Sequence, residues 1–402
     1  MGIQINGQTD TISAIDGALT VSGADLPTVT NLNVSGVTTT ATLRATSIVG
    51  VTTAGITTAY IGSVNDGPLS GARNRIINGD CTINQRNAGV SVTGTGTYPL
   101  DRWKIEYSSN GAIAGIQTTD VPIGQGFTNS IRLTSTARSS FGSGDFNQLF
   151  YSIEGYNVSD LDFGSVSAKP ITLSFWVKGS RVGTYNVQIS NSGGSRTYTK
   201  QYTIPSPDTW QKVILTYPGC TDGTWLKTNG SGLEFRFGFE YGSTFTTGAS
   251  ADTWITASSF VGSFPTTTNT FMTNSNSTWQ ITGVQLEAGT VATPFERRSY
   301  GQELALCQRY FEIQDVRAVT TAYVAGGYNY HVGSVRWKVT KRTAPTTNTP
   351  SIANYQPGGG SGTASVSNQT VDGGLLLSGS TNTTFPNQWV NDNPILTISA
   401  EL

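Results

Sequence analysis

The stretch ITLSFWVK at residues 171–178 carries an aliphatic or aromatic side chain at every second position, beginning with Ile171. Successive side chains of a β-strand point to opposite faces, so this pattern produces one apolar face and one polar face. The apolar face carries Ile171, Leu173, Phe175 and Val177. Two-faced strands of this kind are typical of antiparallel sheets that pack on a core with one side only. The stretch therefore predicts an antiparallel β fold.

The same alternation recurs in RWKIEY (102–107), TYNVQIS (184–190) and LEFRFGFEY (233–241). In the last of these, the residues expected on the apolar face are Leu233, Phe235, Phe237, Phe239 and Tyr241. Those expected on the polar face are Glu234, Arg236 and Glu240. Because many short strands of this kind are separated by Gly, Asn and Ser turns, residues 71–296 are predicted to form a jelly-roll β-sandwich.

WQITGVQLE (279–287) keeps an alternating pattern but changes phase at Thr282 and Gly283. An extra residue in one strand of a pair moves the following side chains to the other face. The sequence therefore predicts a β-bulge at this point.

Composition supports an all-β protein. Charged residues make up 12% of the 402 residues, against about 25% in an average protein, and Gly occurs 47 times. Aromatic residues reach 10%, whereas disordered chains are poor in them. The formal net charge of −1 supplies no basic surplus for nucleic acid. No apolar run approaches the roughly 18 residues that suggest a membrane span, so no membrane insertion is expected.

Residues 1–70 have a different character from the rest. Between Leu26 and Asn65 the only charged residue is Arg44. Gly-Val-Thr-Thr occurs at 36–39 and 50–53, and Gly-Ile-Thr-Thr at 55–58. Sparse apolar repeats need neighbouring copies to bury them, so residues 20–66 are interpreted as the shaft of a homotrimeric fibre. The alternative is a flexible Thr/Gly linker.

Several segments resemble a known fold family. NRIINGDCTINQRN (74–87), YPLDRW (98–103), DTWQKV (208–213) and WQITGVQLEAG (279–289) are similar, in order and spacing, to a carbohydrate-binding-module-type jelly roll. GVQLEAGTVATPFERRSYGQELALCQRYF (283–311) resembles a segment that follows such a jelly roll in phage tail-fibre and virion structural proteins. The Thr/Val shaft resembles the N-terminal parts of cyanophage-type structural proteins.

This resemblance implies a location in the virion, assembled in the host cytoplasm, with other virion proteins bound through the N-terminus and a host surface glycan as ligand. The start MGIQINGQTDTIS has neither the charged beginning nor the apolar middle of a signal peptide, so export by the general secretory route is not expected.

The last quarter of the chain is expected to hold a helix and a second β region. Tyr300, Leu304, Cys307 and Phe311 stand at helical spacing, which predicts a helical connector at 297–315. Its apolar stripe is expected to pack on a neighbouring element or on the same helix of other subunits. Residues 316–402 are expected to form a small C-terminal β tip domain. The predicted division is thus 1–70, 71–296, 297–315 and 316–402.

Aromatic side chains are the candidate ligand contacts, because an aromatic ring stacks on the apolar face of a sugar. Trp176 lies on the polar side of its strand, and Trp225 and Trp254 lie in Gly/Thr-rich loops. Tyr328 and Tyr330 stand near a predicted turn. The alternative for Trp176 is packing under a loop or a neighbouring subunit. Trp103, Trp210 and Trp279 are assigned to the core.

Enzymatic and metal chemistry find little support in the sequence. The single histidine, His331, lies on the apolar face of a predicted strand, where a structural role is expected. No nucleophile elbow, phosphate loop or zinc motif occurs, so no catalytic residue and no cofactor are predicted. The resemblance implies a structural calcium ion, for which Asp80 matches one ligand, although Gly283 stands where a second acidic ligand is common.

Three functions therefore remain open. The first is a receptor-binding tail fibre that attaches to a host glycan. The second is a purely structural virion component, such as a head or collar fibre or a baseplate or decoration protein. The third is an enzyme acting on host polysaccharide, which would need two suitably placed carboxylates. Non-enzymatic attachment is the preferred hypothesis.

Overall fold

The computed structural model describes residues 3–6, 11–14, 73–108, 112–135, 142–258, 260, 262–315, 321–324, 328–348, 351–353, 361–380 and 395–402. The chain divides into two compact units, Met1–Tyr60 and Ile61–Leu402. In the first unit, β1 (Ile3–Asn6) pairs with β2 (Thr11–Ala14) in antiparallel orientation. The shaft predicted at residues 20–66 lies outside the described residues.

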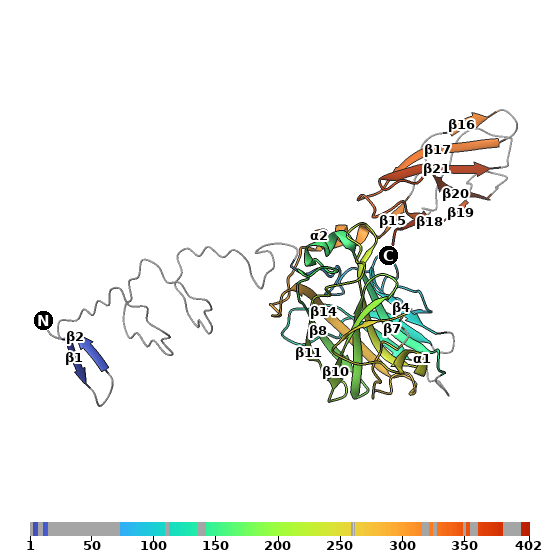
Figure 1. The fold of residues 1–402 in the computed structure, drawn as a ribbon. Helices are drawn as coiled ribbons and strands as arrows, with labels where there is room; N and C mark the ends of the chain where they lie inside the picture. Colours follow the sequence, from blue (N-terminus) through green and yellow to red (C-terminus); the bar gives the residue numbers. More distant parts are fainter. Residues whose placement is uncertain are drawn as a thin grey trace. The chain divides into compact units, whose positions relative to one another are not determined.

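The second unit contains two six-stranded antiparallel sheets (Figure 1). We call the first the cleft sheet; its strands, in spatial order, are β13 (Trp254–Thr256), β10 (Arg196–Ile204), β9 (Gly183–Ser190), β12 (Ser231–Tyr241), β7 (Phe146–Glu154) and β4 (Lys104–Tyr107). We call the second the opposite sheet; its strands are β11 (Gln211–Tyr217), β8 (Ile171–Gly179), β14 (Thr278–Ala288), β6 (Ser130–Ser135), β5 (Ile113–Thr118) and β3 (Val92–Thr93).

Successive strands cross repeatedly between the two sheets, and the closing strand β14 inserts between β8 and β6. The all-β fold with an antiparallel sandwich is confirmed. Short helical turns interrupt it at η1 (Gly155–Asn157), η2 (Ser159–Leu161) and α1 (Ser243–Thr246).

The two sheets bury one continuous hydrophobic core. The predicted apolar face of β8 is fully buried, as are the two large side chains Trp103 and Trp279. The rings of Phe237 and Trp103 lie 5.9 Å apart between the sheets. The assignment of Trp210 to the core was wrong, because this side chain is only half-buried, and its indole Nε1 donates to exposed Asp120 at 3.2 Å.

Two strands change phase along their length. In β14 the register shifts between Thr282 and Gln285, and Gly283 adopts φ 62°, which confirms the predicted bulge. In β12 the register shifts between Gly238 and Tyr241. The prediction that Tyr241 shares the core face was therefore wrong: it hydrogen-bonds to Gln148 on the outer face, while Phe239 remains fully buried in the core.

The helix α2 (Tyr300–Gln308) begins at the N-cap Ser299 and is shorter than predicted. Phe311 opens a strand instead of extending the helix. Cys307 packs on Ile77 and Ile83 of the same chain, so the apolar stripe is covered at least in part by the subunit itself. Tyr300 is 65% exposed and does not belong to that stripe.

The remaining strands form two antiparallel sheets. The smaller contains β15 (Phe311–Asp315), β22 (Ile395–Ser399) and β18 (Thr346–Thr347). The larger contains β16 (Thr321–Val324), β17 (Tyr328–Arg336), β21 (Gly373–Ser380), β20 (Ser361–Ser367) and β19 (Ser351–Ala353). Leu396 and Ile398 are buried together with Trp337. Within the described residues, no helix is long and apolar enough to cross a membrane.

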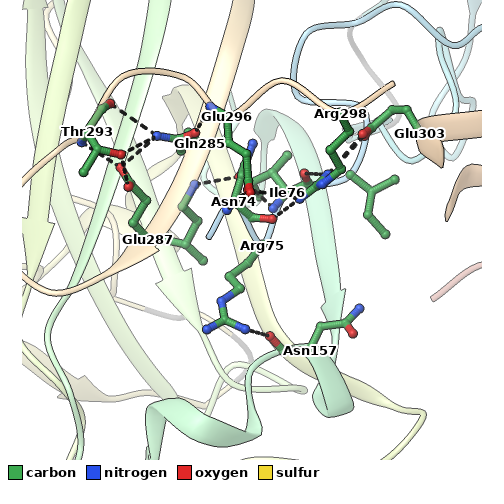
Figure 2. Close-up of polar contacts among 12 residues, drawn as sticks. Asn74, Arg75, Ile76, Asn157, Gln285, Glu287, Thr293, Glu296, Arg298 and Glu303 are labelled. Atoms are coloured by element: carbon green, nitrogen blue, oxygen red, sulfur yellow. Dashed lines mark hydrogen bonds and ion pairs between the residues drawn. The ribbon is translucent and has the colours of Figure 1, made fainter. Parts of the chain in front are cut away.

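Two of the segments that carry the sequence resemblance, 74–87 and 283–311, form hydrogen bonds with each other (Figure 2). Asn74 donates its backbone N–H to Glu296 at 2.7 Å and its side-chain amide to the carbonyl of Val284 at 3.1 Å. Arg298 donates to the carbonyl of Ile76 at 3.2 Å and to Glu303 of α2 at 3.1 Å. The opening segment, the closing strand and the helix therefore form one hydrogen-bonded junction.

Candidate functional site

The outer face of the cleft sheet is polar but largely buried, because a following segment crosses it. Gln188 Nε2 and Thr199 Oγ1 donate to the carbonyl of Ser263 at 3.1 and 2.8 Å. Asn186 donates to the carbonyl of Pro265 at 2.7 Å. These bonds hold residues 262–266 across β9 and β10 and give three side-chain donors the partners that burial would otherwise deny them.

Over β12, β7 and β4, the described residues leave the other half of this face uncovered. A cleft of about 550 Å³ lies there, within the roughly 300–1,000 Å³ range of small-molecule sites. The described residues that line it are Thr95, Gly96, Glu106, Phe146, Gln148, Arg236, Tyr241, Phe245, Phe260 and Phe264. Half of these side chains are aromatic, and three carry polar groups from adjacent strands.

A chain of polar contacts runs across the floor of the cleft. The Tyr241 hydroxyl donates to Gln148 Oε1 at 2.9 Å, and Gln148 Nε2 donates to Glu106 Oε2 at 2.8 Å. Glu106 Oε1 forms an ion pair with Lys104 at 2.7 Å. Burial raises the pKa of Tyr241 well above its ordinary value, so its phenol stays protonated at neutral pH. This chain orients the Gln148 amide and the Glu106 carboxylate toward fixed partners.

Arg236 is held at the centre of the cleft by two hydrogen bonds. Its Nη1 donates to Ser190 Oγ at 2.7 Å, and its Nη2 donates to Glu234 Oε2 at 2.7 Å. The guanidinium carbon lies 3.8 Å from the ring centroid of Phe260 and 5.0 Å from that of Phe150. A guanidinium stacked on rings and paired with a buried carboxylate keeps one orientation, so the site is preorganised.

Aromatic rings form one wall of the cleft. Tyr241 and Phe264 stack with centroids 3.8 Å apart and an interplanar angle of 11°. Phe146 and Phe245 meet edge to face at 5.8 Å. Phe245 also accepts a backbone bond from Phe264 at 3.0 Å, which ties the short helix α1 to the crossing segment. The rings therefore support one another independently of any ligand.

Phe260 has an unusual backbone for its size. Its φ of 66° lies in the left-handed region, which bulky residues rarely adopt. Its ring lies over Gly194, where an added Cβ would come within 2.0 Å of the Phe260 ring. Backbone strain of this kind gathers at ligand sites, where surrounding contacts hold it in place.

The tryptophans predicted from sequence lie outside this cleft. Trp176 is half-buried on β8 of the opposite sheet, on the outer face as expected. Trp225 and Trp254 pack against the core and meet each other at 5.8 Å, with Phe163 4.9 Å from Trp225. Tyr328 lies in β17, as does Tyr330, and the side chains of both lie outside the described part. None of the three tryptophans is among the described residues that line the cleft.

Asp80, the residue that the resemblance implied as a calcium ligand, has a hydrogen-bond partner within the protein. Its Oδ1 accepts from the Thr82 hydroxyl at 2.9 Å. Calcium requires about six or more oxygen ligands, and the described residues contain no group of three or more His, Cys, Asp or Glu side chains that could hold a metal. The opening segment and the closing strand β14 are joined directly, through the backbone bond from Val284 to the carbonyl of Gly79 at 2.8 Å.

Sequence alternation had placed Arg236 on the polar face of its strand, and its position in the cleft confirms this. It could not identify the cleft itself, because the wall comes from Phe245, Phe260 and Phe264 in irregular segments with no periodic signal. The bulge that turns Tyr241 outward follows Gly238. A glycine inside a strand was the one local sequence signal that could have revealed the position of Tyr241.

No family model and no curated protein matches the chain. Among solved structures, the chain is similar to the enzymatically active domain of tailspike protein 4 from bacteriophage CBA120, with 13% identity and a TM-score of 0.31 over 54% of this chain and 21% of that one. The chain thus spans about a fifth of that protein.

A family 11 carbohydrate-binding module of Clostridium thermocellum is also similar, with 10% identity and a TM-score of 0.27 over 52% of this chain and 99% of that one. The C-terminal family 22 carbohydrate-binding module of Xyn10B from the same organism has 11% identity and a TM-score of 0.26, covering 50% and 95% of the two chains. At these identities and TM-scores the matches leave the ligand and the activity to be argued from the site.

Proposed function

We propose that the sandwich binds a glycan in the cleft over β4, β7 and β12. The observation that carries this proposal is the combination of an aromatic wall with oriented amide, carboxylate and guanidinium groups in one cleft of about 550 Å³. Pyranose rings present apolar C–H faces that stack on aromatic rings and hydroxyls that exchange hydrogen bonds with polar side chains. Phe245 and Phe260 supply the first kind of contact, and Gln148 supplies the second.

The wider role in this proposal is a bacteriophage virion fibre that attaches to a host surface glycan. It rests on the resemblance of residues 283–311 to a phage virion segment and on the Thr/Gly-rich repeats at 36–58. The homotrimer, the attachment to other virion proteins through residues 1–70 and the virion location all belong to this proposal.

The proposal assigns attachment without catalysis. Hydrolysis of a glycosidic bond generally uses two carboxyl groups that face each other across the bond. Among the described residues lining the cleft, Glu106 is the one carboxylate, and it is already engaged by Gln148 and Lys104. The arrangement therefore favours binding over hydrolysis.

The direct test is a glycan array probed with the full chain and with Phe260→Ala and Phe245→Ala. Both side chains are partly exposed, so their removal leaves the core intact. We expect binding that either substitution weakens at least about tenfold. The matched control is Tyr300→Ala, which removes an aromatic ring that is 65% exposed outside the cleft and should change nothing.

Binding that survives both Phe substitutions would place the ligand elsewhere, and no binding to any surface glycan would favour the purely structural virion component. Release of reducing ends from host capsule or lipopolysaccharide would instead support the enzyme. The fibre part of the proposal is tested by light scattering with and without residues 1–70. A trimer that becomes a monomer or aggregates on truncation supports it, whereas a monomer in both forms contradicts it.

A further inference from the structure

Among the described residues that line the cleft, both charged side chains are paired before any ligand arrives. Arg236 donates to Glu234 at 2.7 Å, and Lys104 lies 2.7 Å from Glu106. The formal charges of these two cations and two anions sum to zero. Arg236 and Glu234 are both more than nine-tenths buried, so water screens this pair little.

Resting on the proposed function, we propose that the cleft selects uncharged oligosaccharides and rejects sugars that carry a carboxylate. An acidic sugar needs a cation with free bonding capacity and no competing anion. Here each cation already has a carboxylate partner at hydrogen-bonding distance.

Besides finding no free cation among the described lining residues, an acidic sugar in the cleft would be repelled by Glu106. Its carboxylate lines the cleft, and its Oε2 accepts from Gln148 at 2.8 Å. A ligand carboxylate close to Glu106 would face a like charge in a partly desolvated site, which is costly. A neutral hydroxyl in the same place donates to that carboxylate instead, so Glu106 favours one ligand class and opposes the other.

The aromatic wall points to the same ligand class. Tyr241 and Phe264 stack at 3.8 Å, and the Phe260 ring covers the Arg236 guanidinium at 3.8 Å. One planar face of the guanidinium is stacked on a ring and two of its N–H groups are used within the protein, so a ligand carboxylate would have to compete with Glu234 for the charge of Arg236. Stacking on C–H faces of neutral rings requires no such rearrangement.

The experiment uses an array of matched probes: oligosaccharides of glucose, galactose and mannose, each beside the oligomer of the corresponding uronic acid. The two members of a pair differ only at C6, where a hydroxymethyl group becomes a carboxylate. For the full chain we expect at least one neutral probe to bind and its uronate partner to bind at least about tenfold more weakly. Binding of the neutral probe should change little between low and high salt, because no net charge is exchanged.

Glu106→Gln is the variant that tests the mechanism. It keeps the shape of the side chain and removes the anion that faces the ligand, so the ratio of neutral to uronate binding should fall at least about threefold. Asp160→Asn is the matched control, because it removes an equal charge from an ion pair with Arg75 that does not line the cleft. It should leave the ratio unchanged.

The outcomes separate this inference from the proposed function. Uronate probes that bind as well as or better than their neutral partners, with binding lost in Phe260→Ala, would overturn the charge selection and keep the glycan site. An equal fall of the ratio in Glu106→Gln and Asp160→Asn would also overturn it. No binding to either member of any pair would contradict both proposals.

Discussion

The ring of Tyr241 lies directly over Gly238 on the outer face of β12, where an added Cβ would come within 2.4 Å of the Tyr241 hydroxyl oxygen. The register shift between these two residues turns the tyrosine away from the core. Its hydroxyl then reaches Gln148 at 2.9 Å and begins the polar chain across the cleft. The absence of a side chain at Gly238 thus makes room for the Tyr241 ring. This ring forms part of the cleft wall and orients the amide of Gln148.

Gly238→Ala should damage the cleft selectively. A methyl group at this position must displace the Tyr241 ring, which breaks its bond to Gln148 and its stack with Phe264. We expect glycan affinity to fall at least about tenfold and the free energy of unfolding to fall by about 1–3 kcal/mol. The control is Gly144→Ala, because nothing lies within 4 Å of an added Cβ there. Equal affinities for the two variants would show that Tyr241 is not needed for binding.

Trp176→Ala should leave glycan binding unchanged. Trp176 lies on β8 in the opposite sheet and does not line the cleft. We expect a dissociation constant within about twofold of the original chain, measured by calorimetry with the best array ligand, against at least about tenfold weakening for Phe260→Ala. A large loss of glycan affinity in Trp176→Ala alone would show that the binding site lies on the opposite sheet, where the sequence had suggested it.

Asp101 should contribute a distinct pH dependence to stability. Burial raises its pKa to about 6, with nearby Glu401 acting in the same direction and Arg86 and Gln85 opposing it. An unfolded Asp titrates near 3.9, so between these values the folded protein binds the extra proton. The stabilisation from that proton is present below about pH 4 and is lost as the pH rises through about 6.

Asp101→Asn should remove this contribution, because the amide does not titrate. Between pH 7 and pH 4.5 the original chain should gain about 1–2 kcal/mol in free energy of unfolding relative to the variant. Urea unfolding of both proteins across this pH range measures the difference. A difference that does not change with pH would mean that Asp101 ionises alike in the folded and unfolded chain.

Glu154→Gln should weaken the junction between the sandwich and the segment after α2. The carboxylate is almost fully buried and accepts from Arg309 at 2.6 and 2.9 Å and from the Tyr310 hydroxyl at 2.8 Å. Removing its charge weakens three bonds, so we expect the free energy of unfolding to fall by about 1.5–3 kcal/mol. Asp160→Asn at the exposed pair with Arg75 should cost only about 0–1 kcal/mol in the same urea titration. Similar losses for the two variants would argue against a special role for this junction.

The sequence by itself determined the type of fold and much of its core. Alternation in 171–178 and 102–107 placed Phe175 and Trp103 inside, and the phase change at Gly283 correctly predicted a bulge. These features depend on side-chain direction along a strand, which a local period of two residues encodes. The same rule failed at Tyr241, because a second bulge reversed the period within β12.

Only the tertiary structure decided where a ligand can bind. Glu106, Gln148 and Arg236 come from three strands that are far apart in sequence, and hydrogen bonding between β4, β7 and β12 brings them together. Phe260 reaches them from an irregular segment held by Gln188 through the carbonyl of Ser263. A cleft made by pairing distant strands and by the path of a covering loop leaves no periodic trace in the sequence, because periodicity reports the face of a residue and not its neighbours across the sheet.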